Sequence, residues 1–251
     1  MIFQMVVLVT YWPFGTIIIT SRIEFVNQFA QNKNFNDKTV AKGGDFNGLV
    51  PDSEYAIIVK KRGEQMSVKE RILQSAEELI YQKGYDATSI SDIMEVADVG
   101  KGQLYYYFKS KKEIGLTVIQ DILAKWRKEL FEDIFEADKS YSDKFSDMID
   151  WVCQFHESQT VFYGCPIGNL IVELSTEDEN FRCPLNDFMT QWTEKLASLL
   201  QDLHADWSEE RAQLQARQVI SSIQGSIVIL KVSQDIQVLE NNMTDLKKNY
   251  C

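Results

Sequence analysis

Residues 88–112, TSISDIMEVADVGKGQLYYYFKSKK, decide how this chain folds. Apolar residues recur at helical spacing in the first half of the stretch, which predicts a short helix. Residues 98–100 (DVG) predict a tight turn, and a second helix is expected over about 101–108. Two short helices joined by a tight turn are typical of a helix-turn-helix, in which the second helix lies in the major groove of DNA.

The second helix is expected to have an inward and an outward side. Leu104, Tyr107 and Phe108 lie at i, i+3 and i+4 and should form its buried stripe. Three consecutive aromatic residues cannot all face inward on a helix, so a purely structural role for the aromatic run is disfavoured. The residues expected to contact DNA are Thr88, Ser89, Lys101, Gly102, Gln103, Tyr105, Tyr106 and Lys111.

These residue types suit contacts with DNA. Glutamine pairs with adenine through two hydrogen bonds, as expected for Gln103, and Lys101 can reach guanine or a phosphate. Gly102 lets the sugar-phosphate backbone approach closely. Thr88 and Ser89 lie at the start of a helix, where the N-terminus favours phosphate.

Helices are also expected on both sides of this stretch. Apolar residues from Ile72 to Ile80 recur at helical spacing and predict a helix over 68–83, with Gly84 as its terminator. Ser110 should cap a further helix whose first turn presents Lys111. Residues 66–112 are therefore expected to form a three-helix DNA-binding domain.

The same residues carry a family resemblance. Segment 71–114, RILQSAEELIYQKGYDATSISDIMEVADVGKGQLYYYFKSKKEI, resembles the N-terminal domain of the TetR/AcrR family of transcriptional regulators. Gly100 departs from the family pattern, where Ser or Thr is usual, and Asp98 stands where Gly is usual. The resemblance implies an all-α homodimer with two DNA-binding heads on a helical ligand-binding body, which acts as a repressor released by a small molecule. No cofactor is expected.

Residues 113–251 keep helical periodicity and are expected to form a ligand-binding and dimerisation domain. The expected helices span 111–136, 141–158, 166–175, 182–204, 208–232 and 235–249. An apolar face near the C-terminus consists of Ile220, Ile223, Ile227 and Leu230, with Gly225 allowing close helix contact. Long helices with apolar faces suit a four-helix bundle between two subunits, although the same faces can also pack within one subunit.

The motif GCPIGNL, residues 164–170, is the second informative feature. Pro166 suits the first position of a helix, so Cys165 is expected at a helix N-terminus, where the helix dipole stabilises a thiolate. Lys231 is a candidate for lowering the pKa of this thiol further. The motif resembles a stretch in a subgroup of the family, and in some of its members a cysteine here senses electrophiles or oxidants. The alternative is that Cys165 is a small buried hydrophobe.

Large apolar residues of the body suit a pocket for an apolar small molecule. The candidate lining residues are Trp126, Trp151, Phe155, Phe162, Ile167, Leu170, Phe188 and Trp192. A thiol-dependent enzyme is a further alternative, with His156 as the candidate base nearest to Cys165 in sequence. No third group that would orient this base is evident, so we expect no enzyme activity and no catalytic residues.

Composition and charge agree with a globular regulator. The chain has 251 residues and a formal net charge of −11. Residues 129–251 contain 22 acidic and 9 basic residues, whereas residues 66–128 contain 9 and 10. A local basic patch can hold phosphates while an acidic body limits non-specific binding. Two histidines, with no HExxH motif and no paired CxxC, predict no metal site, and four scattered cysteines favour free thiols and a cytoplasmic protein.

Residues 1–65 are expected to be a poorly structured extension. Residues 1–19 are strongly apolar, but no Lys or Arg precedes them as in a signal peptide, and Pro13 and Gly15 interrupt them. Met66 lies just before the first convincing helix, so one hypothesis is that translation begins there. The alternatives are an accessory arm, or a membrane anchor that would make this a membrane-tethered regulator.

The sequence therefore predicts an all-α, sequence-specific DNA-binding transcriptional regulator. Its expected partners are double-stranded DNA with a palindromic operator, a small-molecule or electrophile inducer and a second copy of the chain, with no membrane.

Overall fold

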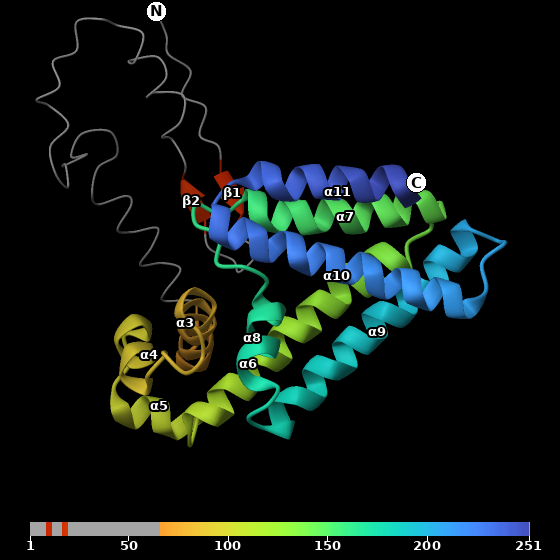
Figure 1. Cartoon of the computed structure of the whole chain (residues 1–251). Coiled ribbons are helices and arrows are strands. Elements are labelled where there is room, and N and C mark those ends of the chain that lie inside the picture. Colours follow the sequence, from red (N-terminus) through yellow and green to blue (C-terminus); the bar gives the residue numbers. More distant parts are fainter. Residues whose placement is uncertain (1–8, 12–16, 20–65, 251) are drawn as a thin grey trace, which may run out of the picture. The chain divides into compact units, whose positions relative to one another are not determined.

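The structure is a computed structural model, and it describes residues 9–11, 17–19 and 66–250 (Figure 1). Met1–Ser67 and Val68–Cys251 form separate compact units. In the first unit, strands β1 (Val9–Tyr11) and β2 (Ile17–Ile19) pair in an antiparallel manner. The expectation that 1–65 is poorly structured is therefore wrong for these two strands. The rest of that expectation, with the possible start at Met66 and the membrane anchor, falls mainly outside the described residues.

The unit from Val68 onward is built from helices, as the sequence predicts. Three of them form the head of the unit: α3 (Val68–Lys83), α4 (Ile90–Ala97) and α5 (Lys101–Tyr107). Their shared core contains Ile72, Ile93 and Leu104, each at most 1% exposed. In the part of the chain that the structure describes, no helix is both long and apolar enough to cross a membrane.

Local chemistry explains where these short helices begin and end. Gly84 follows α3 with φ +94, a left-handed conformation that glycine adopts without strain. The Ser89 side chain caps α4 by accepting a hydrogen bond from the amide of Asp92, and the Asp92 carboxylate accepts one from the amide of Ser89. Asp98 then ends α4 with φ 50, so an aspartate occupies a position that usually favours glycine.

The helix that leaves the head changes its winding halfway along. Ser110 caps α6 (Lys111–Trp126), and the chain continues as the π-helix η1 (Arg127–Phe135). The sequence predicts one helix over 111–136, which is confirmed in extent but not in winding. The π-helix spans nine residues and begins directly after Trp126.

The body contains α7 (Tyr141–Glu157), α8 (Pro166–Leu174), α9 (Glu179–Leu203), α10 (Glu209–Ser233) and α11 (Ile236–Tyr250). Helix α10 packs along α9 and α11, and α11 also packs on α7 (Figure 1). The sequence places the start of α9 three residues too late. The Asp178 side chain caps this helix by accepting a hydrogen bond from the amide of Asn180, so α9 begins before Pro184 rather than beside it.

Helix α10 has two apolar faces, of which the sequence predicts one. The predicted set, Ile220, Ile223, Ile227 and Leu230, is at most 5% exposed and packs inside the chain. A second stripe faces outward and consists of Leu214, Val228, Ile229 and Val232, which are 47%, 67%, 50% and 83% exposed. A Cβ added to Gly225, which is also exposed, would meet no atom of the described residues within 4 Å. Among the described residues, no close contact therefore requires a glycine at position 225.

Candidate DNA interface and effector cavity

Helix α5 presents an aromatic surface to solvent. Tyr106 is 81% exposed, and Tyr105 is 42% exposed. The prediction that Tyr107 belongs to the buried stripe is wrong, because its side chain is 37% exposed and packs edge-on against Tyr106 at 4.9 Å. Helix α5 ends at Tyr107, and the extended backbone of Phe108 turns that side chain into the core instead.

The backbone at the start of α5 is exposed and free of bulky side chains. Gly100 has no side chain to cap the helix, and its amide donates to Oε1 of Gln103 at 3.0 Å. Gln103 thus binds the amide of the N-cap residue, but the first amides of α5 lack the side-chain cap that the usual Ser or Thr would provide, because Gly100 has no side chain. A Cβ added to Gly102 would meet nothing within 4 Å among the described residues. Gly102 and Lys101 are both exposed, so this end of α5 is bare enough for a close backbone approach.

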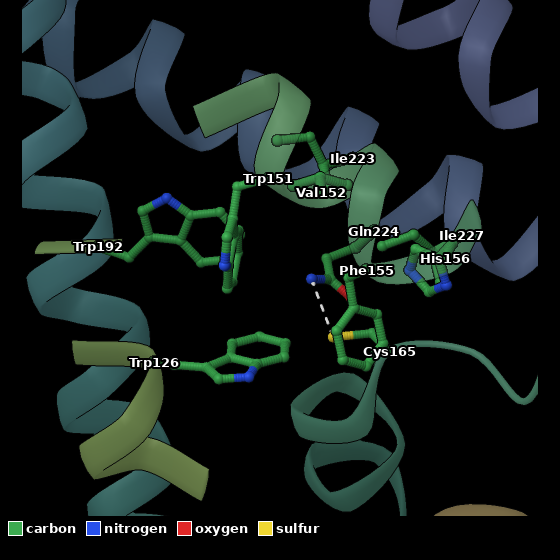
Figure 2. A pocket seen from close by; sticks show the side chains of 10 residues that line it. All are labelled: Trp126, Trp151, Val152, Phe155, His156, Cys165, Trp192, Ile223, Gln224 and Ile227. Carbon is green, nitrogen blue, oxygen red and sulfur yellow. Dashed lines mark hydrogen bonds between the residues drawn. The ribbon is translucent and has the colours of Figure 1, made fainter. Parts of the chain in front are cut away.

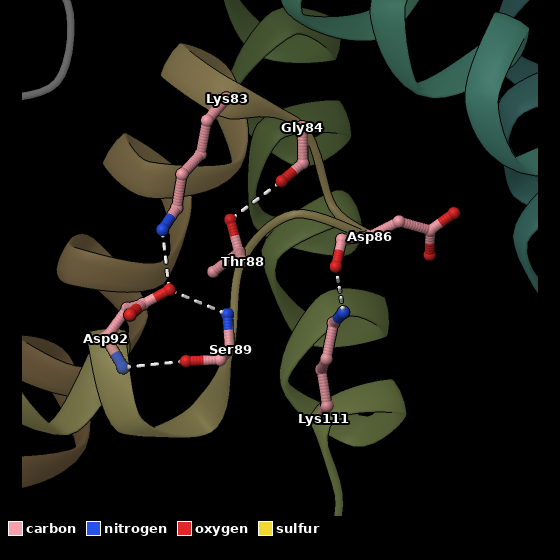
Figure 3. Close-up of polar contacts among 7 residues, drawn as sticks. All are labelled: Lys83, Gly84, Asp86, Thr88, Ser89, Asp92 and Lys111. Carbon is pink, nitrogen blue, oxygen red and sulfur yellow. Dashed lines mark hydrogen bonds and ion pairs between the residues drawn. The ribbon is translucent and has the colours of Figure 1, made fainter.

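The two residues predicted to bind phosphate at α4 differ in their surroundings (Figure 3). Thr88 is fully buried, and its hydroxyl donates to the carbonyl of Gly84 at 2.7 Å. The prediction that the Thr88 side chain contacts DNA is therefore wrong: its hydroxyl serves the turn after α3. Ser89 is exposed and caps α4, so its hydroxyl proton can still be donated outward.

Lys111 is folded onto the head rather than extended into solvent (Figure 3). Its Nζ donates to the carbonyl of Asp86 at 3.1 Å and lies 4.4 Å from the ring centroid of Tyr85. The neighbouring Lys112 forms an ion pair with Asp178 at 2.5 Å. A phosphate contact by Lys111 therefore requires this side chain to leave, or to share, its partners in the turn after α3.

A cavity lies in the body between α6, α7, α8, α9 and α10 (Figure 2). The space between atoms at this site is about 270 Å³, part of which is open to solvent, and the centre of a water molecule reaches only about 20 Å³. Its walls are formed by Trp126, Trp151, Val152, Phe155, His156, Cys165, Trp192, Ile223, Gln224 and Ile227. In the view of Figure 2, the three tryptophans lie on one side and Cys165, Gln224 and His156 on the other.

Half of this lining is in the predicted set. Of the predicted residues, the cavity brings together Trp126, Trp151, Phe155, Cys165 and Trp192. Those that do not line it are Phe162, Ile167, Leu170, Phe188 and Lys231. Ile167, Leu170 and Phe188 are core residues, and the backbone of Phe162 binds the side chain of Gln234 instead. His156 is a wall residue that is not predicted from the sequence, although it follows Val152 by one helical turn on the same apolar face of α7.

The surroundings of Cys165 differ from the prediction. Its sulfur caps α8 by accepting hydrogen bonds from the amide of Gly168 at 3.3 Å and from Nε2 of Gln224 at 3.5 Å. These donors favour the thiolate, but burial outweighs them and raises the pKa of the thiol. Lys231 does not contact the sulfur: its stem packs beside Gly164. The predicted lowering of this pKa is therefore wrong, because desolvation dominates.

Helix α8 connects the wall of the cavity to the head. At one end, the hydroxyl of Tyr81 on α3 lies within hydrogen-bond distance of the carbonyl of Gly164 (2.9 Å), next to Cys165. At the other end, the Glu173 carboxylate accepts hydrogen bonds from the amides of Tyr85 at 2.9 Å and Asp86 at 2.7 Å. A shift of α8 therefore moves contacts in the last turn of α3 and in the turn that follows this helix.

Metal ligands do not gather in the described residues, where no group of three or more His, Cys, Asp or Glu side chains could hold an ion. Cys153, Cys165 and Cys183 are free thiols.

Comparison with known proteins identifies the class of this molecule. Residues 72–116 match the model of bacterial regulatory proteins of the tetR family, and residues 142–244 match the C-terminal domain of LmrA/YxaF-like transcriptional regulators. An uncharacterized HTH-type transcriptional regulator in the lacX 3′ region of Lactococcus lactis is 42% identical over 184 residues, which cover 73% of this chain and 93% of that protein. The chain belongs to the TetR family. As a TetR-family protein it is a DNA-binding transcriptional regulator and not an enzyme.

Further relatives in the TetR family include the transcriptional repressor NemR of Escherichia coli. It is 24% identical over 190 residues, which cover 71% of this chain and 92% of NemR. The crystal structure of E. coli NemR in its reduced form has a TM-score of 0.61 and covers 73% of this chain and 97% of that one. A TetR regulator from Legionella pneumophila has a TM-score of 0.64 at 22% identity, covering 74% of this chain and 98% of that one. These likenesses agree on the all-α fold.

Proposed function

We propose that this TetR-family regulator is a cytoplasmic, homodimeric repressor that leaves a palindromic operator when its body binds a small molecule or reacts with an electrophile. The observation that carries the proposal is the path through α8. The cavity wall at Cys165 is next to Gly164, which Tyr81 of the head contacts, and Glu173 of the same helix holds the amides of Tyr85 and Asp86. A molecule that widens the cavity displaces α8 and thereby the head.

The proposed DNA interface is the exposed side of α5 together with the start of α4. Tyr105 and Tyr106 contact phosphates and thymine methyl groups, and the bare backbone at Gly102 approaches a sugar-phosphate strand. Its remaining members are Ser89, Lys101, Gln103 and Lys111. The high exposure of the α5 tyrosines supports this assignment, because large apolar rings exposed on a short helix indicate a binding surface.

The proposed dimer interface is the outward stripe of α10. Its four large apolar residues lie at helical spacing and remain exposed in one subunit. Gly225 interrupts the stripe, although no contact among the described residues requires a glycine there. A glycine at this position lets a second helix approach closely. A dimer also presents two α5 helices to two half-sites, which raises the number of bases read.

A second release route uses Cys165, because a reaction at this residue of the cavity wall would act directly on α8. The thiol is buried and its pKa is raised, so it reacts only when the cavity opens. Alkylation adds bulk beside Gln224 in a tight space, so it would displace α8 as a bound ligand does. Cys165→Ser tests the route. If N-ethylmaleimide releases the operator from the native protein and equally from the Ser variant, Cys165 is not the reactive thiol.

The central experiment measures binding of the full chain to the DNA upstream of its own gene, by fluorescence anisotropy over a range of salt concentrations. We expect tight binding that weakens steeply with salt, as phosphate contacts require. Tyr106→Ala should weaken binding about tenfold, whereas Tyr141→Ala, at a residue 45% exposed on α7, should not. Equal binding by both variants would remove α5 from the interface.

A further inference from the structure

Two polar atoms in the cavity wall have no hydrogen-bond partner. Within the described residues, Nδ1 of His156 and Nε1 of Trp192 are buried and unpaired. The two side chains are 2% and 1% exposed, and both line the cavity (Figure 2). Buried polar groups are nearly always hydrogen-bonded, because leaving such a bond unmade costs the desolvation of the group. Two exceptions in one small cavity point to a ligand that supplies the missing bonds.

From this arrangement we infer that the effector is an uncharged, planar aromatic molecule whose hydrogen-bond acceptor, such as a carbonyl oxygen, binds Nε1 of Trp192. The inference rests on the proposed function, because it assigns ligand chemistry to the same cavity. An indole N–H only donates, so its partner has to be an acceptor. A neutral imidazole can donate or accept at Nδ1, so His156 adapts to a second polar group on the ligand.

The ligand is uncharged because the cavity offers no opposite charge. None of the wall residues that the structure describes is Asp, Glu, Lys or Arg. Burial lowers the pKa of His156 to about 4, so this side chain is neutral at physiological pH. The carboxylate of Glu129 stands outside the wall and accepts the N–H of Trp151 at 3.2 Å. An anion in this space would be buried without a partner, which is strongly unfavourable. A cation would gain only the attraction of the aromatic ring faces, with no carboxylate in the wall to balance its charge.

The ligand is planar because of the shape and chemistry of the walls. Trp126 packs edge-on against Trp151 at 4.9 Å and against Phe155 at 5.9 Å. Aromatic rings favour such edge-to-face and offset contacts, which a further flat ring can join. The space open to water is only about 20 Å³, so any ligand has to separate the walls. A flat molecule requires the smallest separation.

The test uses four naphthalene compounds of similar size with the full-length protein, and it follows binding by calorimetry. The first pair is 2-acetylnaphthalene, which has a carbonyl oxygen, and 2-isopropenylnaphthalene, which has a methylene group in its place. The second pair is charged: 2-naphthoate and 2-naphthyltrimethylammonium. We expect 2-acetylnaphthalene to bind about tenfold or more tightly than the isopropenyl compound and than either ion.

Two tryptophan variants locate the acceptor's partner. Trp192→Phe keeps an aromatic ring but removes the N–H, so the preference for the acetyl compound should fall to about onefold. Trp207→Phe is the matched control, because Trp207 stacks on His204 at 4.1 Å and does not line the cavity. This variant should keep the native preference.

Several outcomes would overturn the inference. Equal binding of the acetyl and isopropenyl compounds to the native protein would do so whether or not the variants fold, and tighter binding of an ion would as well. An unchanged preference in Trp192→Phe would remove Trp192 as the partner. Binding by none of the four compounds would exclude aromatic ligands of this size, while operator binding by the same sample would leave the DNA-binding part of the proposed function intact. The expected preference without operator release would keep the ligand chemistry and contradict release by ligand.

Discussion

Glu173 on α8 binds the backbone amide of Asp86 at 2.7 Å, across 87 residues of sequence. The same carboxylate accepts the amide of Tyr85, so one side chain of the body holds the turn that follows the first helix of the head. Hydrogen bonds to a carboxylate are stronger than neutral ones. This contact ties the orientation of the DNA-binding head to the position of α8, whose first turn borders the cavity.

Glu173→Ala should loosen the head without unfolding it. Loss of two charge-assisted hydrogen bonds is expected to lower the free energy of unfolding by about 2 kcal/mol. Hydrogen–deuterium exchange followed by mass spectrometry should show faster exchange in peptides that contain Tyr85 and Asp86. Glu177→Ala, at an exposed residue just after α8, is the control. Unchanged exchange in the Glu173 variant would mean that the carboxylate does not hold this turn.

Gly102→Ala separates folding from DNA binding. The added Cβ meets nothing within 4 Å in the described part of the chain, and alanine favours a helix by up to about 1 kcal/mol. The melting temperature should therefore stay the same or rise, as measured by circular dichroism. Operator affinity should nevertheless fall about tenfold, because the methyl group occupies the space of the DNA backbone. A variant that is stable and binds normally would show that the DNA does not approach here.

Val228→Glu should yield monomers. Two carboxylates brought together in an apolar interface would be buried without partners, which costs several kcal/mol. Light scattering coupled to size-exclusion chromatography measures the mass directly. Val172→Glu is a matched control, because Val172 is 86% exposed on α8, away from the α10 stripe. A dimer that survives the Val228 change would move the interface to another face.

His156 makes the protein sensitive to acid. Burial lowers the pKa of His156 from 6.5 to about 4. The unfolded chain therefore binds a proton at this residue below pH 6.5, whereas the folded chain binds it only near pH 4. Stability should therefore be fully present above pH 6.5 and fall by at most about 3 kcal/mol towards pH 4. In His156→Phe this loss should disappear, whereas His204→Phe should retain it. Urea unfolding at pH 7 and pH 4.5, at one protein concentration, provides the comparison.

Glu77 changes the stability of the protein with pH in the opposite direction to His156. Burial on α3 raises the pKa of Glu77 to about 7, although Lys125 opposes the shift, so the folded protein holds a proton that the unfolded chain releases above pH 4.5. Its contribution is present below pH 4.5 and is lost as the pH rises through 7. Glu77→Gln should thus stabilise the protein by about 1 kcal/mol at pH 8, after allowance for partial exposure, and by nothing at pH 4. Glu78→Gln, at an exposed neighbour, should be neutral at both pH values.

The sequence predicts the helices well because their periodicity and caps are local. Leu104 and Phe108 are buried as expected, and Gly84 ends α3. Tyr107 is placed wrongly because a helical spacing does not show that the helix ends at that residue. Thr88 is also placed wrongly, because its hydroxyl has a closer partner in the preceding turn.

Contacts between distant segments are the part that the sequence does not reveal. Four of the eight residues expected to line a pocket are found there, since large aromatic residues tend to be buried together, and the proposed sensor Cys165 joins them. Neither Gln224 nor His156 is expected from the sequence to line the cavity. The pKa of Cys165 depends on how deeply its thiol is buried in the body, which no local pattern encodes. The hydrogen bonds from the amides of Tyr85 and Asp86 to Glu173 join two segments far apart in the chain, and no sequence pattern in either segment predicts them.

The hydrogen bond between Gln103 and the backbone amide of residue 100 has a consequence for how the protein would search a genome. Gln103 is folded back on the amide of Gly100, so the residue proposed to recognise adenine already has a partner while the protein slides along non-target DNA. Only a correctly placed adenine offers a better one. If Gln103 reads adenine as proposed, recognition exchanges one hydrogen bond for two, whereas a wrong base leaves the bond to Gly100 in place. We therefore expect the protein to move rapidly along DNA between operators.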